Sequence, residues 1–107
     1  MGAKLDFHSL SNRALQKHIR QTAQDSSRVF FTEHAYERMA LRSVNDLQVL
    51  ACLKGGVIER PPQVDAKTGD LKCRMEHFGS SRNLAVVVTL DNEDPDILVV
   101  TVITQTR

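Results

Sequence analysis

Apolar residues recur along this chain at helical spacing in the first half and at strand spacing in the second half. Over residues 9–24 they return every three or four positions, which is typical of an amphipathic helix, and one of two serines at its start can cap it. A short β-rich piece over 28–31 follows. It ends at Thr32, a residue that favours the start of a helix and here predicts a second one over 33–42.

A third helix is expected to begin at Ser43. The segment Ser43-Val44-Asn45-Asp46 matches a capping box, with aspartate in place of the usual glutamate. Apolar residues continue at helical spacing to Leu53, and Gly55-Gly56 ends the pattern, since glycine tolerates the left-handed backbone that often closes a helix. Two short helices are therefore predicted to meet at a corner at Ser43.

Four segments after Gly56 have the composition of strands. Residues 57–60 are stopped by two prolines, which favours an edge position, and 71–78 alternate apolar with polar positions. The runs 84–90 and 97–104 are apolar on both faces, as in strands that are covered on both sides. We predict an α+β fold in which N-terminal helices precede a four-stranded, mainly antiparallel β-meander.

A sheet that is apolar on both faces needs cover on both. The helices after the first one can cover one face. The other face needs the N-terminal helix, a second copy of the chain in a homodimer, or a partner protein.

The length of 107 residues and an ordinary composition, 41% hydrophobic and 25% charged, predict one soluble domain. No apolar run is long enough to span a membrane and no signal peptide is apparent, so we expect a cytoplasmic protein. The formal net charge is only +1, whereas nucleic-acid binders draw much of their affinity from an excess of basic residues. Any nucleic-acid site on this chain must therefore be a local cluster.

His34, Arg38 and Arg42 are spaced four residues apart and would share one stripe of the second helix. A histidine can exchange a proton near neutral pH, and two guanidinium groups can neutralise charge on a phosphorane. This stripe is therefore a candidate for handling phosphate. The alternative is a solvated helix face, because Glu33 and Glu37 lie close enough to form helical ion pairs with the arginines.

A second basic group lies in the strand region. Lys72 and Arg74 alternate onto one face of the same strand, and Arg82 lies in the turn that follows. If these side chains face a cleft they supply donors for phosphate, and if they face solvent they only keep an edge soluble. The histidines are scattered and no Cys-x-x-Cys pair occurs, so we expect no metal site and no cofactor.

The run H-A-Y-E-R-M-A-L-R over residues 34–42, followed by Val44 and by 56–59, resembles an uncharacterised bacterial family marked by H-A-x-x-R-M-x-x-R. In that family two short helices precede a β-meander, a layout similar to that of the RelE, ParE and BrnT toxin superfamily. The likeness covers residues 30–105 of the single domain 1–107 and leaves 1–29 as an N-terminal helical extension.

This resemblance implies a toxin of a toxin–antitoxin system. Many such toxins are ribonucleases, free or ribosome-dependent, that an antitoxin holds inactive. The implied reaction is metal-independent cleavage of RNA by attack of the 2′-hydroxyl on the adjacent phosphate, with His34 as the acid or base. Arg38 and Arg42 would complete the catalytic set by binding the phosphate, and the substrate-binding residues would be Lys72, Arg74 and Arg82.

Two other functions fit the same sequence. One is a non-catalytic protein that regulates or inhibits a partner through an exposed apolar face. The other is an RNA-binding module without chemistry. A stable partner complex without nuclease activity would favour the first, and steeply salt-dependent RNA binding without cleavage would favour the second.

Overall fold

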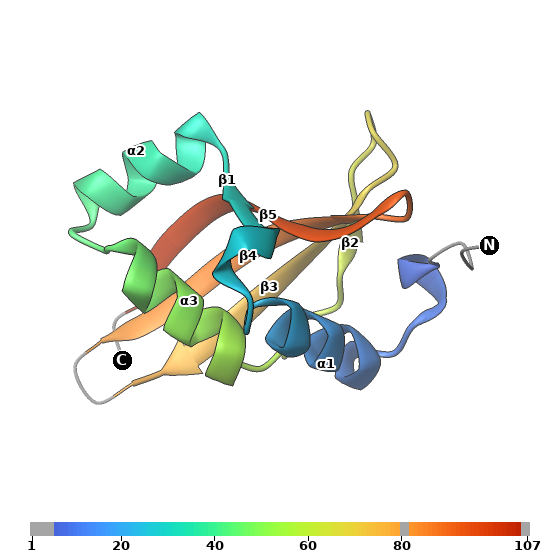
Figure 1. Ribbon diagram of the computed structural model, residues 1–107, viewed down its shortest axis with the longest axis horizontal. Helices are drawn as coiled ribbons and strands as arrows, with labels where there is room; N and C mark the ends of the chain where they lie inside the picture. Colours follow the sequence, from blue (N-terminus) through green and yellow to red (C-terminus); the bar gives the residue numbers. More distant parts are fainter. Residues whose placement is uncertain (1–5, 80–81, 106–107) are drawn as a thin grey trace.

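The computed structural model describes residues 6–79 and 82–105, which form three α-helices and a five-stranded sheet (Figure 1). The helices are α1 (Asn12–Thr22), α2 (Glu33–Leu41) and α3 (Asp46–Gly55). The strands are β1 (Val29–Phe31), β2 (Gln63–Val64), β3 (Leu71–Phe78), β4 (Asn83–Asp91) and β5 (Asp94–Gln105). None of the helices within these described ranges is long and apolar enough to cross a membrane.

The α+β class is confirmed, but the sheet has five strands and is mixed, where a four-stranded, mainly antiparallel meander was expected. Its order is β1-β5-β4-β3-β2, with β3, β4 and β5 antiparallel in succession and β1 parallel to β5. The expected strand over 57–60 contributes only a bridge between Val57 and Glu76. Pro61 and Pro62 lack an N–H group and cannot continue a ladder, so the edge strand β2 forms after them.

The predicted helix starts are right for the first two helices and displaced for the third. Thr32 caps α2, its hydroxyl accepting a hydrogen bond at 3.0 Å from the backbone N–H three residues later, and Ser11 caps α1 in the same way at 3.1 Å. The capping box of α3 pairs Asn45 with Gln48. Ser43 has a φ of 53° and forms the corner between the two helices instead. The glutamine reaches back to the cap, a reach that the shorter aspartate side chain lacks.

Gly56 follows α3 for a reason other than the expected left-handed cap. Its φ is −80° and its backbone is extended, a conformation that other residues also adopt. The constraint is space: a Cβ atom here would lie 2.5 Å from the carbonyl oxygen of Cys52 and 2.9 Å from that of Glu76. Glycine is required because the end of α3 and strand β3 approach each other closely.

The two faces of the sheet differ in burial. Helices α1 and α3 lie on one side of it in Figure 1, and on that side Cys73, Met75 and Val86 are fully buried. Their neighbours Arg74 and Val87 point the other way and are only half-buried, with no described helix over them. We call these two sides the covered face and the uncovered face.

Helix α2 closes the outer edge of β5 beyond the end of β1. Strand β1 pairs only with residues 97–99, and α2 packs along the rest of that strand. The backbone N–H of Thr32 donates to the carbonyl of Val99 at 3.0 Å, and Arg42 Nε donates to the carbonyl of Val102 at 3.0 Å. An edge carbonyl that β1 is too short to reach is thus satisfied by a side chain.

We expect Gly56→Ala to lower the free energy of unfolding by about 1–3 kcal/mol, because the added methyl group must displace backbone carbonyls. Gly55→Ala is the matched control: its Cβ would meet only the end of the His77 side chain, at 3.4 Å, and alanine favours a helix. Urea unfolding followed by circular dichroism measures both variants. A Gly56→Ala variant as stable as the wild type would contradict the close approach of α3 and β3.

Candidate functional site

Helix α2 presents His34 and Arg38 toward the uncovered face of the sheet. Phe31 pairs with the buried Val99, so its ring lies on the covered side, and Tyr36 stacks on it with ring centroids 5.3 Å apart. His34 lies about 200° round the helix from Tyr36. Because of this rotation, the exposed side chain of His34 is turned to the opposite side of the sheet from Tyr36. Arg38 follows one helical turn further along.

The two side chains contact each other, with Arg38 Nε donating to His34 Nε2 at 3.4 Å. A donor at this atom requires an unprotonated Nε2, so the neutral ring carries its hydrogen on Nδ1. Neither Glu33 nor Glu37 forms an ion pair with an arginine in the part of the chain that the structure describes. The pair therefore combines a hydrogen-bond acceptor with a cation that no carboxylate of residues 6–79 and 82–105 neutralises.

Arg42 and Arg82, which the sequence groups with the candidate site, are both engaged by backbone carbonyls. Arg42 bonds the carbonyl of Val102 at the edge of β5. The guanidinium group of Arg82 donates to the carbonyls of Ser43 and Arg42, both at 2.7 Å. It ties the start of β4 to the corner between α2 and α3, so these two arginines hold the fold around the site.

Lys72 and Arg74 line a pocket of about 240 Å³ on the uncovered face, beside the edge of β3. Arg60 and Pro61, from the segment that leads into β2, and Gln63, the first residue of β2, also line it. Three cationic side chains thus converge on one concave surface, which we call the basic pocket. Such a surface suits an anionic ligand, for which guanidinium groups offer paired donors.

The cations of the basic pocket are only partly neutralised. Lys72 Nζ lies 3.4 Å from a carboxylate oxygen of Asp65. Arg74 Nε lies 3.8 Å from Glu76 Oε1, too far for a hydrogen bond, and this buried nitrogen has no hydrogen-bond partner among the described residues. A buried donor without a partner is a place that a ligand or water can satisfy.

The sequence interpretation missed Arg60 and Gln63. The stretch that carries them has the pattern of a strand end and a loop, and neither residue belongs to a motif. The available signal was the double proline between them, because Pro61-Pro62 restricts the backbone to an extended path. That path carries Arg60 alongside the strand that bears Lys72.

The basic pocket and the α2 pair face the same side of the sheet but do not touch. Arg74 pairs with Val87, and Val87 with Thr101, so β4 and β5 separate the basic pocket from α2. The two strand spacings from β3 to β5 alone amount to about 10 Å, and α2 lies beyond β5. An extended anionic chain could contact both sets of residues, whereas a single phosphate group could not.

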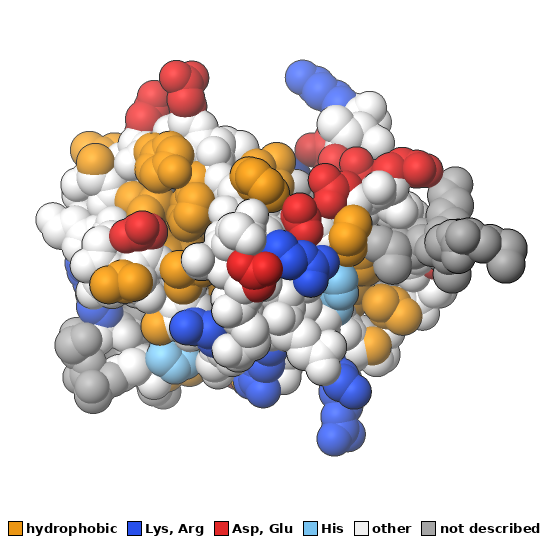
Figure 2. Space-filling view, in the orientation of Figure 1, with side chains coloured by type: hydrophobic (Ala, Val, Ile, Leu, Met, Phe, Trp, Pro, Cys, Tyr) orange, Lys and Arg blue, Asp and Glu red, His pale blue; other side chains and the backbone are white. Residues whose placement is uncertain are grey.

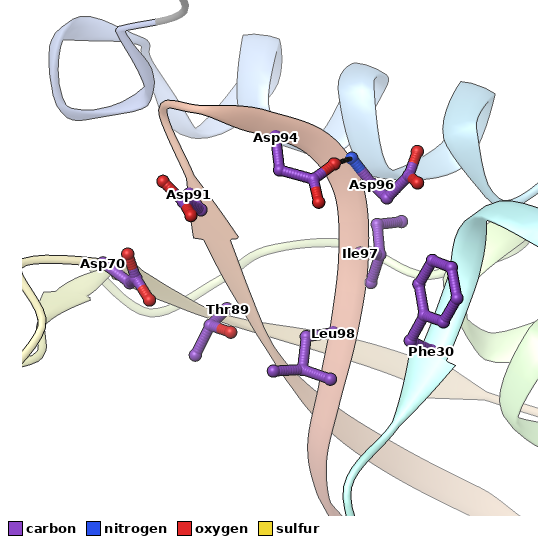
Figure 3. A pocket seen from close by; sticks show the side chains of 8 residues that line it. All are labelled: Phe30, Asp70, Thr89, Asp91, Asp94, Asp96, Ile97 and Leu98. Atoms are coloured by element: carbon purple, nitrogen blue, oxygen red, sulfur yellow. Dashed lines mark hydrogen bonds between the residues drawn. The ribbon is translucent and has the colours of Figure 1, made fainter.

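A second pocket on the uncovered face is acidic (Figure 3). It has a volume of about 350 Å³, and Phe30 and Leu98 form its apolar wall. The carboxylates that line this acidic pocket are those of Asp70, Asp91, Asp94 and Asp96. In the described ranges no group of three or more histidine, cysteine or acidic side chains is arranged to hold a metal ion.

Neither cysteine is available as a nucleophile near neutral pH. Cys52 and Cys73 are fully buried, and burial raises the pKa of each thiol to about 12. The thiolate, not the thiol, is the nucleophile. His34, which α2 turns to the uncovered side, is the remaining candidate for general acid–base chemistry.

The chain matches a family described as a domain of unknown function (DUF4258) over residues 31–104. No curated protein and no solved structure matches it. The matched span begins at the last residue of β1 and ends in β5, so it contains the α2 pair and the basic pocket and leaves out α1.

Arg42→Ala should lower the free energy of unfolding by about 1–3 kcal/mol, because it leaves the buried carbonyl of Val102 without its donor. Arg38→Ala is the control on the same helix. Among the described residues its side chain bonds only His34, so the change should stay within about 0.5 kcal/mol. Chemical unfolding of the two variants checks this. Equal losses in both would show that Arg42 is no more structural than Arg38.

Proposed function

The chain belongs to the DUF4258 family, and we propose that it is a toxin-like, metal-independent ribonuclease of a toxin–antitoxin system. The observation that carries the proposal is the His34–Arg38 pair, a proton acceptor and a cation 3.4 Å apart on the exposed surface of α2. The sequence resemblance to the RelE- and BrnT-type toxins, from which short helices before a largely antiparallel sheet are expected, motivates the proposal. The activity would be exercised on RNA in the cytoplasm.

In the proposed reaction Arg38 Nε turns from His34 to the phosphate, and the freed lone pair of His34 Nε2 accepts the proton of a ribose 2′-hydroxyl as that oxygen attacks the adjacent phosphorus. The bond from phosphorus to the 2′-oxygen forms and the bond to the 5′-oxygen breaks. The product is a 2′,3′-cyclic phosphate, and the leaving 5′-oxygen takes a proton from solvent. Arg38 stabilises the charge that grows on the phosphorane oxygens, and Arg42 acts by holding α2 against β5.

The basic pocket would bind a second phosphate of the same RNA strand. The strand would cross the uncovered face from Lys72 and Arg74 on β3 toward α2, over β4 and β5. The carboxylates of the acidic pocket repel phosphate and so restrict the path of the strand. Single-stranded RNA fits such a path, since its unpaired backbone can follow a groove that a duplex cannot.

A second candidate function, a non-catalytic protein that binds a partner, is favoured by a different surface. Apolar side chains gather over α2 and α3 in Figure 2. The most exposed of those that the two helices carry are Leu41 and Leu47, at 72% and 73%, and Tyr36, at 56%. Exposed apolar surface of this kind marks protein-interaction sites. An antitoxin or another partner would dock here under either function.

Induced expression of the wild type in a bacterial host should arrest growth and cleave RNA. His34→Ala should lower the cleavage rate by about 10²–10⁴-fold, because the proton acceptor is lost, and Arg38→Ala should lower it as well. Glu37→Ala, which lies on the same helix and is exposed, is the matched control and should cleave as the wild type does. Growth and total RNA integrity are followed together at equal soluble expression.

Cleavage that persists in both His34→Ala and Arg38→Ala would show that the active site is not on α2. Intact RNA and normal growth with the folded wild type would reject the ribonuclease and leave the partner-binding function. Binding of RNA without cleavage would instead identify a module without chemistry.

Binding of a labelled single-stranded RNA should weaken as salt is raised, and Arg74→Ala should make the dependence shallower. Each lost phosphate contact reduces the slope of log affinity against log salt by about 0.7 for a single strand. Lys17→Ala, an exposed cation on α1 away from the uncovered face, is the control and should leave the slope unchanged. Fluorescence anisotropy between about 50 and 200 mM salt measures it. Identical slopes for Arg74→Ala and the wild type would exclude the basic pocket as the phosphate site.

A further inference from the structure

The uncovered face of the sheet carries apolar surface that none of the described helices covers. Phe30 is 52% exposed, and the pairing of β1 with β5 places it beside Leu98, which is also exposed. Val87 and Ile103 continue the apolar surface along β4 and β5 and are half-buried. A strand that is apolar on both faces is typical of a sheet with both faces covered. The face therefore has the character of an interface.

The strand register fixes where the charges lie on this face. Lys72 is opposite Thr89, Thr89 is opposite Leu98, and Leu98 is beside Phe30, so one row of side chains crosses from β3 to β1. Lys72 lines the basic pocket, and the other three line the acidic pocket. We call the side over β2 and β3, which carries the basic pocket, the basic half, and the side over β4, β5 and β1, which carries Asp91, Asp94 and Asp96, the acidic half; Asp70, just before β3, lies at their boundary.

We propose that a second copy of the chain covers this face, in a two-fold symmetric dimer whose axis runs along the strands at the boundary between the halves. In a two-fold interface every contact occurs twice: if a residue of the first protomer contacts a second residue on its partner, the same two residues also meet with the protomers exchanged. The acidic pocket of each protomer then faces the basic pocket of its partner, and the apolar side chains around them leave water. Two twisted sheets pack face to face with their strands nearly aligned, which this axis allows.

Self-complementary charge is the reason for a second copy and not a different partner. The cations Arg60, Lys72 and Arg74 and the carboxylates of Asp91 and Asp94 lie on one and the same face. Asp96 also lines the acidic pocket, but it is already paired with Arg28 at 2.9 Å. A net charge of +1 adds little general repulsion between two copies. The inference goes beyond the proposed ribonuclease and does not depend on it.

Sedimentation velocity of the full chain, up to high micromolar concentration, tests the proposal. We expect a reversible dimer that weakens as salt is raised. The charge-reversal variants are Arg60→Glu/Lys72→Glu and Asp91→Lys/Asp94→Lys. Each variant alone sets like charges against each other and should self-associate more than about tenfold more weakly than the wild type.

Mixed in equal amounts, the two variants should recover the dimer, because every contact then joins opposite charges again. Lys17→Glu on the exposed side of α1 is the control and should dimerise as the wild type does. Circular dichroism checks folding, and the single changes Lys72→Glu and Asp94→Lys replace either double variant that fails to fold. A wild type that stays monomeric, or a mixture that associates no better than its components, overturns the dimer. Sedimentation records assembly alone, so neither result depends on whether the chain cleaves RNA.

Discussion

The outer edge of β5 is hydrogen-bonded by two different elements in succession. Strand β1 pairs with its first part, and α2 takes over where β1 ends, with Arg42 donating to an edge carbonyl. The ring of Phe31, the last residue of β1, lies on the covered side, and Tyr36 of α2 stacks on it. These contacts fix the rotation of α2 about its helix axis. That rotation turns Tyr36 to the covered side and His34 and Arg38 to the other. The chemistry proposed for α2 thus depends on a contact at the sheet edge and not on the helix alone.

Local patterns predicted the local structure, and long-range contacts explain what they missed. The cap at Thr32 and the helix that follows depend on neighbours a few residues away, and both are present. The parallel pairing of β1 with β5 joins segments far apart in sequence, and three residues of β character carry no information about partner or direction. The same holds for Arg42: helical spacing groups it with His34, but its acceptor lies 60 residues further along the chain.

The residues of the basic pocket were likewise predicted from the sequence only in part. Alternation along β3 predicts that Lys72 and Arg74 share a face, and they line one pocket. Arg60 and Gln63 join them only because the chain folds back beside β3 after the prolines, which no periodicity reports. Net charge was also a poor guide here. A value of +1 describes a balanced molecule, whereas the uncovered face separates its charges into two halves.

This separation links the two proposals through the basic pocket. A phosphate backbone and the carboxylates of a partner protomer are both anions, and the same cations would bind either of them. RNA and a second copy would therefore exclude each other from the uncovered face. The dimer would be the form in which the phosphate site is closed, and its dissociation would open that site. The acidic half that would stabilise the dimer would repel RNA once the protomers separate. A face that is self-complementary in charge therefore lacks the broad positive potential of an ordinary RNA-binding surface.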